Sequence, residues 1–476
     1  MLIISSNLLL TSCSDLETDL YVINTEAPDD NILASDPIAL AATSEGLYRA
    51  IHQANHSYNS PSIALNTMAD VNSCSWGNFG MRDLSSEPRV SFNNDTSYGN
   101  DVTNTYFNAL YTVLSDANTI VLAVNNGTEF SNPDLMLTIA KFNQALAIGY
   151  NALIFDKVWL SDENGAINDG VATGYLEAMD FALEKLDEAI AIAKNNSFTV
   201  PANYFTFEMT SEQLAGLMNS YGARFATNIP RNSTQRNNVD WTKVKAYAES
   251  GLDIDYSPIH DDINWYSLYH TYLNYPGWAR TDLRIIGLMD PDYPSYWPDN
   301  TTILPEAQSL DARLESDFQY LNGQTFRPER GEYHYSSYRY KRHDEYLSEW
   351  TIPTSEMPVA ETKMYLAEAN LRLNNLSVAA SIINNSTRIT RGKLDPVSAN
   401  TTEITNAIFY EMMVELGQSS PFISFCTMRG YDLLQSGTLL HFPVPGAALI
   451  AIPEDNYTFG GSEGTPGEDF STGGWR

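Results

Sequence analysis

The chain has 476 residues, enough for one large domain or two to three ordinary ones. It carries 59 acidic and 27 basic residues, a formal net charge of −32, and such a surface repels the phosphates of nucleic acids and anionic lipids. This charge argues against DNA, RNA or an anionic membrane surface as a partner, while the 12% aromatic content is typical of a folded protein.

The N-terminus has the pattern of a lipidated secretory signal. An apolar run ends in Leu10-Thr11-Ser12-Cys13, which is typical of a lipobox, and we predict a signal peptide over 1–12 and a lipidated Cys13. Because Met1 to Leu10 contains no Lys or Arg, we expect translation to start upstream of Met1. Residues 13–34 are predicted to form an extended tether. The alternative is an ordinary N-terminal segment with a chance cysteine.

The remaining residues, 35–476, are predicted to form a single, mostly α-helical domain. Apolar residues at helical spacing predict helices over 37–55, 103–125, 134–157, 175–195, 211–227, 240–249, 360–373 and 378–391. Helix pairs of this size resemble tetratricopeptide repeats, which stack into a rigid scaffold. We expect helical repeats at about 37–255 and about 355–445. No stretch of about 20 apolar residues is apparent beyond the N-terminus.

The region between the repeats, about 256–350, is rich in aromatic residues and turns. Ten Tyr or Trp residues fall between Tyr256 and Asp299, where the chain average predicts about five aromatic residues of any kind. Pro and Gly divide this stretch into loops. Tyr333 to Tyr335 and Tyr338 to Lys341 alternate as a pair of short strands would, giving minor β structure. Asp70 to Arg82 is a second loop rich in aromatic and amide side chains.

Several segments, in this order, resemble the SusD/RagB family of outer-membrane lipoproteins. They are Phe107-Asn108-Ala109-Leu110-Tyr111, Ala360 to Ala369, Arg388-Ile389-Thr390-Arg391-Gly392, Ile408 to Leu416, Arg429 to Leu433, His441-Phe442-Pro443-Val444-Pro445 and Tyr457 to Gly461. The likeness covers nearly the whole chain from Cys13. One departure is Glu411 to Leu416, where members commonly carry an arginine-rich version of the motif.

This resemblance implies a function in nutrient uptake at the cell surface. A SusD-like protein is a lipid-anchored lid on a SusC-like TonB-dependent transporter, in the outer membrane and facing the cell exterior. It binds glycans, either oligo- or polysaccharides, and delivers them to the barrel. Two alternatives stay open, which are peptide capture by a RagB-like protein and a protein-docking scaffold without a ligand of its own.

Carbohydrate binding needs flat apolar faces for sugar C–H groups and planar polar groups for the hydroxyls. The two aromatic loops supply both, and the predicted ligand-binding residues are Asn72, Trp76, Asn78, Phe79, Trp265, Tyr266, Trp278, Arg280 and Asp282. The alternative is that these aromatic rings pack the loops against the helices. Arg280 and Asp282 could equally form a structural ion pair.

Catalysis and metal binding have little support in the sequence. The seven histidines are scattered along the chain, and no catalytic, phosphate-binding or zinc motif is apparent. We therefore predict no enzyme activity, no cofactor and no metal site, although calcium at Asp261-Asp262 or Asp29-Asp30 stays open. Cys74 and Cys426 are expected to be small buried side chains, with a disulfide as the alternative.

Overall fold

Long helices form the first half of the domain. The computed structural model describes residues 36–57, 59–74, 80–95, 99–298, 303–322, 335–349, 351–452 and 454–475, so the predicted signal, Cys13 and tether lie outside it. The long helices are α2 (Pro37–His56), α6 (Thr105–Asn125), α7 (Pro133–Ile154), α8 (Tyr175–Asn195), α10 (Ser211–Asn228) and α12 (Trp241–Glu249). These agree with the predicted helices to within a few residues.

Local capping explains where these helices begin. Asp36 precedes Pro37 at the start of α2, and its carboxylate accepts a hydrogen bond from the Ile38 amide at 2.9 Å. The start of α10 is a capping box, in which the Thr210 and Gln213 side chains each accept from the other's backbone amide. These pairs satisfy amides that have no partner inside the helix.

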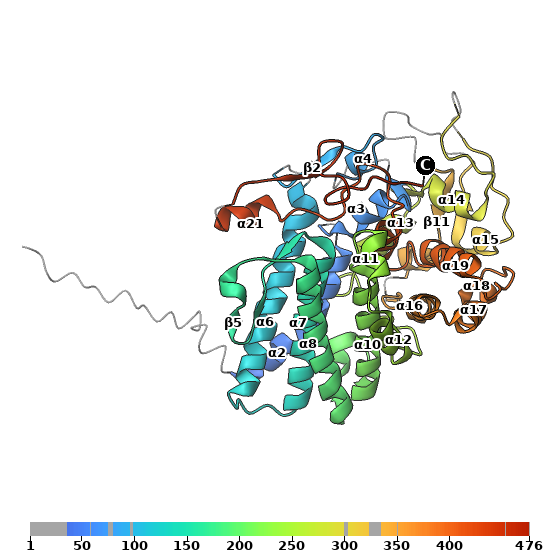
Figure 1. Ribbon diagram of the computed structural model, residues 1–476. Coiled ribbons are helices and arrows are strands. Elements are labelled where there is room, and N and C mark those ends of the chain that lie inside the picture. The colour runs from blue at the N-terminus through green and yellow to red at the C-terminus, as the bar shows by residue number, and fades with distance from the viewer. Residues whose placement is uncertain are drawn as a thin grey trace, which may run out of the picture.

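The long helices stack in a row, each packed against the next along the chain. Figure 1 shows α2, α6, α7, α8 and α10 side by side, and α12 continues the row from α10 to α16 (Val359–Arg372). One apolar core runs through all of them, from Leu40 on α2 to Leu449 near the C-terminus. This arrangement confirms the predicted mostly helical, tetratricopeptide-like scaffold with minor β structure.

A second group of helices follows the aromatic region. It consists of α16, α17 (Leu376–Asn384), α18 (Thr387–Thr390), α19 (Thr401–Val414), α20 (Ile423–Gly430) and α21 (Gly446–Ala451). The continuous helix predicted over 378–391 is wrong. The chain breaks at Asn385 and Ser386, and the Ser386 hydroxyl accepts from the Arg388 amide to begin α18. A residue with a strong capping side chain therefore outweighs the apolar spacing.

Buried arginines join the two helical groups. The Arg224 guanidinium on α10 donates two hydrogen bonds to Glu361 on α16, at 2.6 and 2.8 Å. Twelve residues later, Arg236 on α11 (Ser233–Asn237) donates in the same way to Glu368, which lies two turns after Glu361 on α16. All four side chains are 2% exposed or less. Arg236 holds the pKa of Glu368 below its usual range against the opposing effect of burial.

Short elements fill the rest of the domain. The helices are α3 (Pro61–Met68), α4 (Met81–Leu84), α9 (Ala202–Phe205), α11 (Ser233–Asn237), α13 (Leu268–Asn274), α14 (Leu283–Met289) and α15 (Arg313–Asp317). The paired strands are β1 (Asn72–Cys74) with β9 (Ala279–Thr281), β2 (Ser91–Asn93) with β12 (Thr458–Gly460), β3 (Lys157–Val158) with β6 (Thr173–Gly174), β4 (Ser161–Asp162) with β5 (Gly165–Ala166), β7 (Thr199–Val200) with β8 (Met209–Thr210), and β10 (Phe318–Tyr320) with β11 (Tyr338–Tyr340). All six pairs are antiparallel.

The strand partner predicted for residues 338–341 is wrong. Strand β11 pairs with β10, and Tyr338 lies opposite Tyr320. Tyr335, which was expected to pair with this strand, instead forms a β-bridge with Asp282. Sequence alternation identifies a strand but not its partner, because the partner is chosen by tertiary packing.

One helix among the described residues, Val102–Asn125, is long and apolar enough to cross a membrane by composition alone. In the structure Leu110, Ala117 and Ile120 of this helix are fully buried against α2 and α7, whereas Leu122 is exposed. These contacts are those of a core helix.

Close packing of α10 against α12 depends on a glycine. A Cβ atom at Gly222 would lie 2.7 to 2.8 Å from three atoms of the buried Tyr247 ring, including the ring carbon nearest the backbone. We expect Gly222→Ala to lower the free energy of unfolding by about 1 to 3 kcal/mol through overpacking. The matched control is Gly287→Ala in α14, where no atom lies within 4 Å of the added Cβ. The control should gain up to about 1 kcal/mol. Equal effects in urea denaturation would contradict the packing argument.

Candidate functional site

The two loops predicted to bind ligand meet at one strand pair. Strand β1 belongs to the loop 70–82 and strand β9 to the aromatic region, and Ser73 lies opposite Arg280 in their antiparallel register. The sequence contains no signal for this pairing, because about 200 residues separate the strands. The pairing places Asn72, Arg280 and Asp282 within one small area of the fold.

An exposed aromatic surface lies immediately before β9. Helix α13 ends at Asn274, and a turn closed by the Trp278 amide and the Tyr275 carbonyl follows it. The Trp278 ring lies between Tyr272 and Tyr275, with ring centroids 5.2 and 5.1 Å away. Tyr272 is buried, Trp278 is half-buried and Tyr275 is 46% exposed. We call Tyr272, Tyr275 and Trp278 the aromatic platform.

The platform rests on a small apolar core of its own. Its members are Ile63, Met81, Tyr269, Tyr272, Leu273 and Ala279, and Trp278 packs against them. These residues come from α3, α4, α13 and β9. The platform is therefore held by elements from both loops, and its Trp278 ring is fixed by packing from below.

Arg280 and Asp282 flank the platform in different environments. Asp282 is 1% exposed, and its carboxylate accepts from the Ser73 hydroxyl at 2.7 Å and from the Arg284 amide at 2.9 Å. It therefore caps α14 and ties this helix to β1. Arg280 is half-buried, and burial lowers the pKa of its guanidinium. Arg280 is a charged group beside the platform.

The other predicted site residues are buried, lie away from the platform or fall outside the described residues. Trp265 is 6% exposed and packs in the core against Tyr48 and His52, and Asn72 is 1% exposed and donates to the Thr67 hydroxyl. The structure thus gives Trp265, Asn72 and Asp282 internal contacts in place of the expected ligand contacts. Tyr266 is half-buried beside Tyr346. Trp76, Asn78 and Phe79 lie outside the described residues.

Two further expectations concern acids and cysteines. The Asp261 carboxylate accepts hydrogen bonds from the backbone amides of Ile263 and Trp265, which explains this acid without a calcium ion. Cys426 is a buried free thiol, as expected, and the side chain of Cys74 lies outside the described part of the chain.

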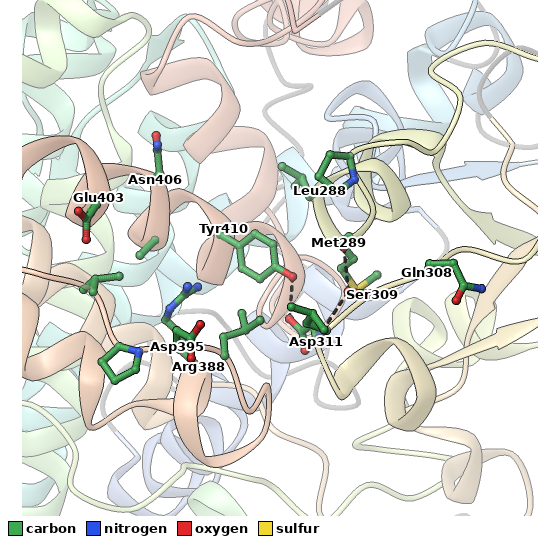
Figure 2. Close-up of a pocket in the computed structure, with 16 residues that line it drawn as sticks. Leu288, Met289, Gln308, Ser309, Asp311, Arg388, Asp395, Glu403, Asn406 and Tyr410 are labelled. Atoms are coloured by element: carbon green, nitrogen blue, oxygen red, sulfur yellow. Dashed lines mark hydrogen bonds between the residues drawn. The ribbon is translucent and has the colours of Figure 1, made fainter.

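A pocket of about 570 Å³ contains none of the predicted site residues. Figure 2 shows its walls, formed by the end of α14, the segment before α15, and residues of α18 and α19. The Tyr410 hydroxyl donates to Asp311 at 2.7 Å across one wall. Half of the lining side chains are apolar, and Tyr410 is the only aromatic ring among them. Sequence reasoning missed this pocket because its walls come from segments far apart in the chain.

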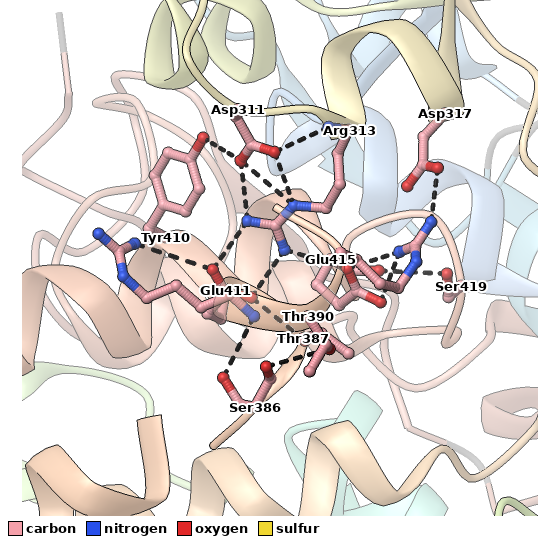
Figure 3. A network of polar contacts seen from close by, with 12 residues as sticks. Asp311, Arg313, Asp317, Ser386, Thr387, Thr390, Tyr410, Glu411, Glu415 and Ser419 are labelled. Atoms are coloured by element: carbon pink, nitrogen blue, oxygen red, sulfur yellow. Dashed lines mark hydrogen bonds and ion pairs between the residues drawn. The ribbon is translucent and has the colours of Figure 1, made fainter. Parts of the chain in front are cut away.

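Asp311, one of the acids on the pocket wall, belongs to a buried charge network centred on Arg313. Figure 3 shows this guanidinium between Asp311, Glu411 and Glu415, and it donates to Glu411 at 2.7 and 2.8 Å. Arg391 bridges Glu415 and Asp317 on the other side. Glu411 and Glu415 are the acids at which the sequence departs from the family's arginine-rich motif. Their charges are thus satisfied internally, which argues for a structural role.

Solved structures identify this arrangement of helices as a SusD-like fold. A SusD superfamily protein from Parabacteroides distasonis matches with a TM-score of 0.62 at 12% identity, over 88% of this chain and 98% of that chain. A SusD-like carbohydrate binding protein from Bacteroides vulgatus matches with a TM-score of 0.54 at 15% identity, over 80% and 81%. A structure with xylogluco-oligosaccharide matches with a TM-score of 0.52 at 15% identity, over 82% and 83%. No family model and no curated protein matches the sequence.

The role of Asp282 can be tested by substitution. Asp282→Ala removes a helix cap and leaves the buried Ser73 hydroxyl without its acceptor, so we expect a loss of about 2 kcal/mol in the free energy of unfolding. Asp262→Ala, at an exposed acid, is the control and should change stability by less than about 0.5 kcal/mol. Urea denaturation measures both variants. An Asp282→Ala protein as stable as the control would contradict the structural role of this carboxylate.

Proposed function

We propose that this protein, which has a SusD-like fold, binds glycans through the aromatic platform and delivers them to a SusC-like TonB-dependent outer-membrane transporter. The observation that carries the proposal is the pair of accessible rings, Tyr275 and Trp278, held beside Arg280 on a fold shared with a carbohydrate binding protein.

The platform has the chemistry that sugars require. The face of a pyranose carries C–H groups that pack on an aromatic ring, and its edge carries hydroxyls that need polar partners. Tyr275 and Trp278 are tilted by 41° to one another, so the two rings present a bent surface and not a flat one. A curved oligosaccharide would contact both rings at once. The Arg280 guanidinium supplies donors at the rim.

Calorimetry with glycans and peptides tests this proposal. We expect a panel of xyloglucan oligosaccharides, maltooligosaccharides and mixed-linkage glucans to include a binder. Trp278→Ala and Tyr275→Ala should each weaken it about tenfold, because a ring contact contributes about 1 kcal/mol beyond its burial. The control Ile450→Ala removes an exposed apolar side chain on α21, away from the platform, and should leave the affinity unchanged.

The same experiment separates the alternatives. Binding of oligopeptides in place of sugars would favour peptide capture. Binding of no ligand, with the barrel still co-purifying, would favour a docking scaffold. Sugar binding that survives both ring substitutions would place the glycan site elsewhere. Glycan hydrolysis in the same samples would overturn the expectation that the protein is not an enzyme.

Attachment to the outer membrane completes the proposal. A lipid on Cys13 would hold the protein at the mouth of its transporter, where a high effective concentration favours transfer of a captured glycan. The tether at 13–34 would span the distance between the membrane and α2.

Mass spectrometry of the membrane fraction tests this anchoring. We expect the mature chain to begin at Cys13 and to carry the added mass of acyl chains. Cys13→Ser should release the protein from the membrane fraction, whereas the control Cys426→Ser should leave it there. Recovery of an unmodified chain beginning at Met1 in the cytosol would contradict lipid anchoring.

A further inference from the structure

Five of the seven histidines, distant in sequence, meet inside the domain. They are His52 and His56 on α2, His260 before α13, His270 on α13 and His343, and we call them the histidine cluster. The first four are each 1% exposed or less. Neither glycan binding nor the stacking of the scaffold requires imidazoles at this position.

Three residues of this region are arranged for chelation. His52 and His56 are four residues apart on α2, so their rings project from the same face of the helix. Glu356 approaches them from the segment before α16, with its Oε2 atom 2.9 Å from His52 Nδ1. One potential ligand atom from each of His52, His56 and Glu356 lies within 4.8 Å of the others. A small adjustment of side chains brings these atoms to the spacing of ligands around one ion.

The His260 ring lies beside this group, outside the set whose potential ligand atoms are all within 4.8 Å of one another, and it is the nearest candidate for a fourth ligand by ring position. Zinc–nitrogen bonds of about 2.0 Å place the ring centroids of two tetrahedral imidazole ligands about 5 Å apart. The centroid of His260 lies 5.1 Å from that of His52 and 6.1 Å from that of His56. Its ring is fully buried, yet neither nitrogen has a hydrogen-bond partner among the described residues.

Unsatisfied nitrogens are the strongest sign that this site has a ligand. Within the described part of the chain, His52 Nε2 also lacks a hydrogen-bond partner, although the residue is fully buried. Buried polar atoms of folded proteins are nearly always paired, and three unpaired ring nitrogens in one place are unusual. A metal ion accepts the lone pair of such a nitrogen and so supplies the partner that the nitrogen lacks.

Hydrogen bonding also favours metal binding. The Ser267 hydroxyl lies 2.8 Å from both His56 Nδ1 and His270 Nδ1 and orients the His56 ring from behind. The Tyr48 hydroxyl donates a hydrogen bond to the Glu356 carboxylate and thereby orients it.

We propose that His52, His56, His260 and Glu356 form a binding site for one divalent transition-metal ion, with Zn²⁺ as the preferred occupant. Histidine nitrogens and carboxylate oxygens are both ligands that this ion takes in tetrahedral sites. Because the ligands are enclosed, the site is structural and not catalytic. The site joins α2 to the segment that carries His260 and to the segment that carries Glu356. These two segments also pair with each other, because the backbone of Tyr256 bonds to Met357 and that of His260 to Ile352.

Zinc content of the full chain tests the proposal. The protein is unfolded in guanidinium with EDTA, refolded with excess Zn²⁺ and desalted, and its metal is counted by mass spectrometry. We expect about one zinc per chain and a melting temperature above that of protein refolded in EDTA. Refolding with Co²⁺ should give the visible absorption bands of a tetrahedral cobalt site. Less than 0.1 zinc per chain in the wild type would overturn the proposal.

Matched variants locate the ion. The double variant His52→Gln/His56→Gln should hold at least tenfold less zinc than the wild type. The control His441→Gln alters another buried histidine, which contacts Tyr175 and Phe459 outside the histidine cluster, and should keep one zinc per chain. Full zinc content in the double variant would mean that zinc binds elsewhere and would overturn the site. Should the double variant fail to refold, the cobalt spectrum of the wild type decides, because its absence would overturn a tetrahedral site. The outcome is independent of glycan binding.

Discussion

The pairing of Arg224 with Glu361 is the contact on which the arrangement of the domain depends. Both groups are charged and fully enclosed, and a buried charge without its partner costs several kcal/mol, so α10 and α16 have to meet in this register. A third bond from the same guanidinium reaches the Glu356 carbonyl at 3.0 Å. Arg224 therefore also sets the path of the chain before α16. The Glu356 carboxylate is placed beside α2 as a consequence.

Other buried arginines act on helix ends instead of on acids. Arg231 donates to the carbonyls of Leu153 and Ala152 at 2.6 Å. Arg429 donates to the same Leu153 carbonyl at 3.3 Å and to the carbonyl of Leu440, in a C-terminal loop, at 2.7 Å. The last carbonyls of α7 have no partner inside the helix and carry partial negative charge, which a guanidinium stabilises. The chain thus uses enclosed cations to join its C-terminal segments to the end of a core helix. The outer loops are built on this rigid frame.

Local signals in the sequence predicted the helices well. The bounds of α8 agree with the prediction because apolar residues recur at helical spacing and few polar side chains compete for the backbone. The prediction failed over 378–391, where Asn385 and Ser386 satisfy backbone groups in a turn and end the helix. It also failed for the partner of β11, because alternation along a strand carries no information about the strand beside it.

The sequence by itself determined the helical class, the aromatic character of the middle region and the types of side chain that could bind a ligand. These properties depend on residues close together in the chain or on composition alone. Tertiary structure decided which aromatic rings reach the surface, since Trp265 and Trp278 have the same chemistry but only Trp278 lies in an accessible turn. Tertiary structure also brought β1 to β9 and collected five distant histidines in one place. Such contacts join residues hundreds of positions apart, and they are selected by the burial of whole faces and the pairing of enclosed charges, which no local pattern records.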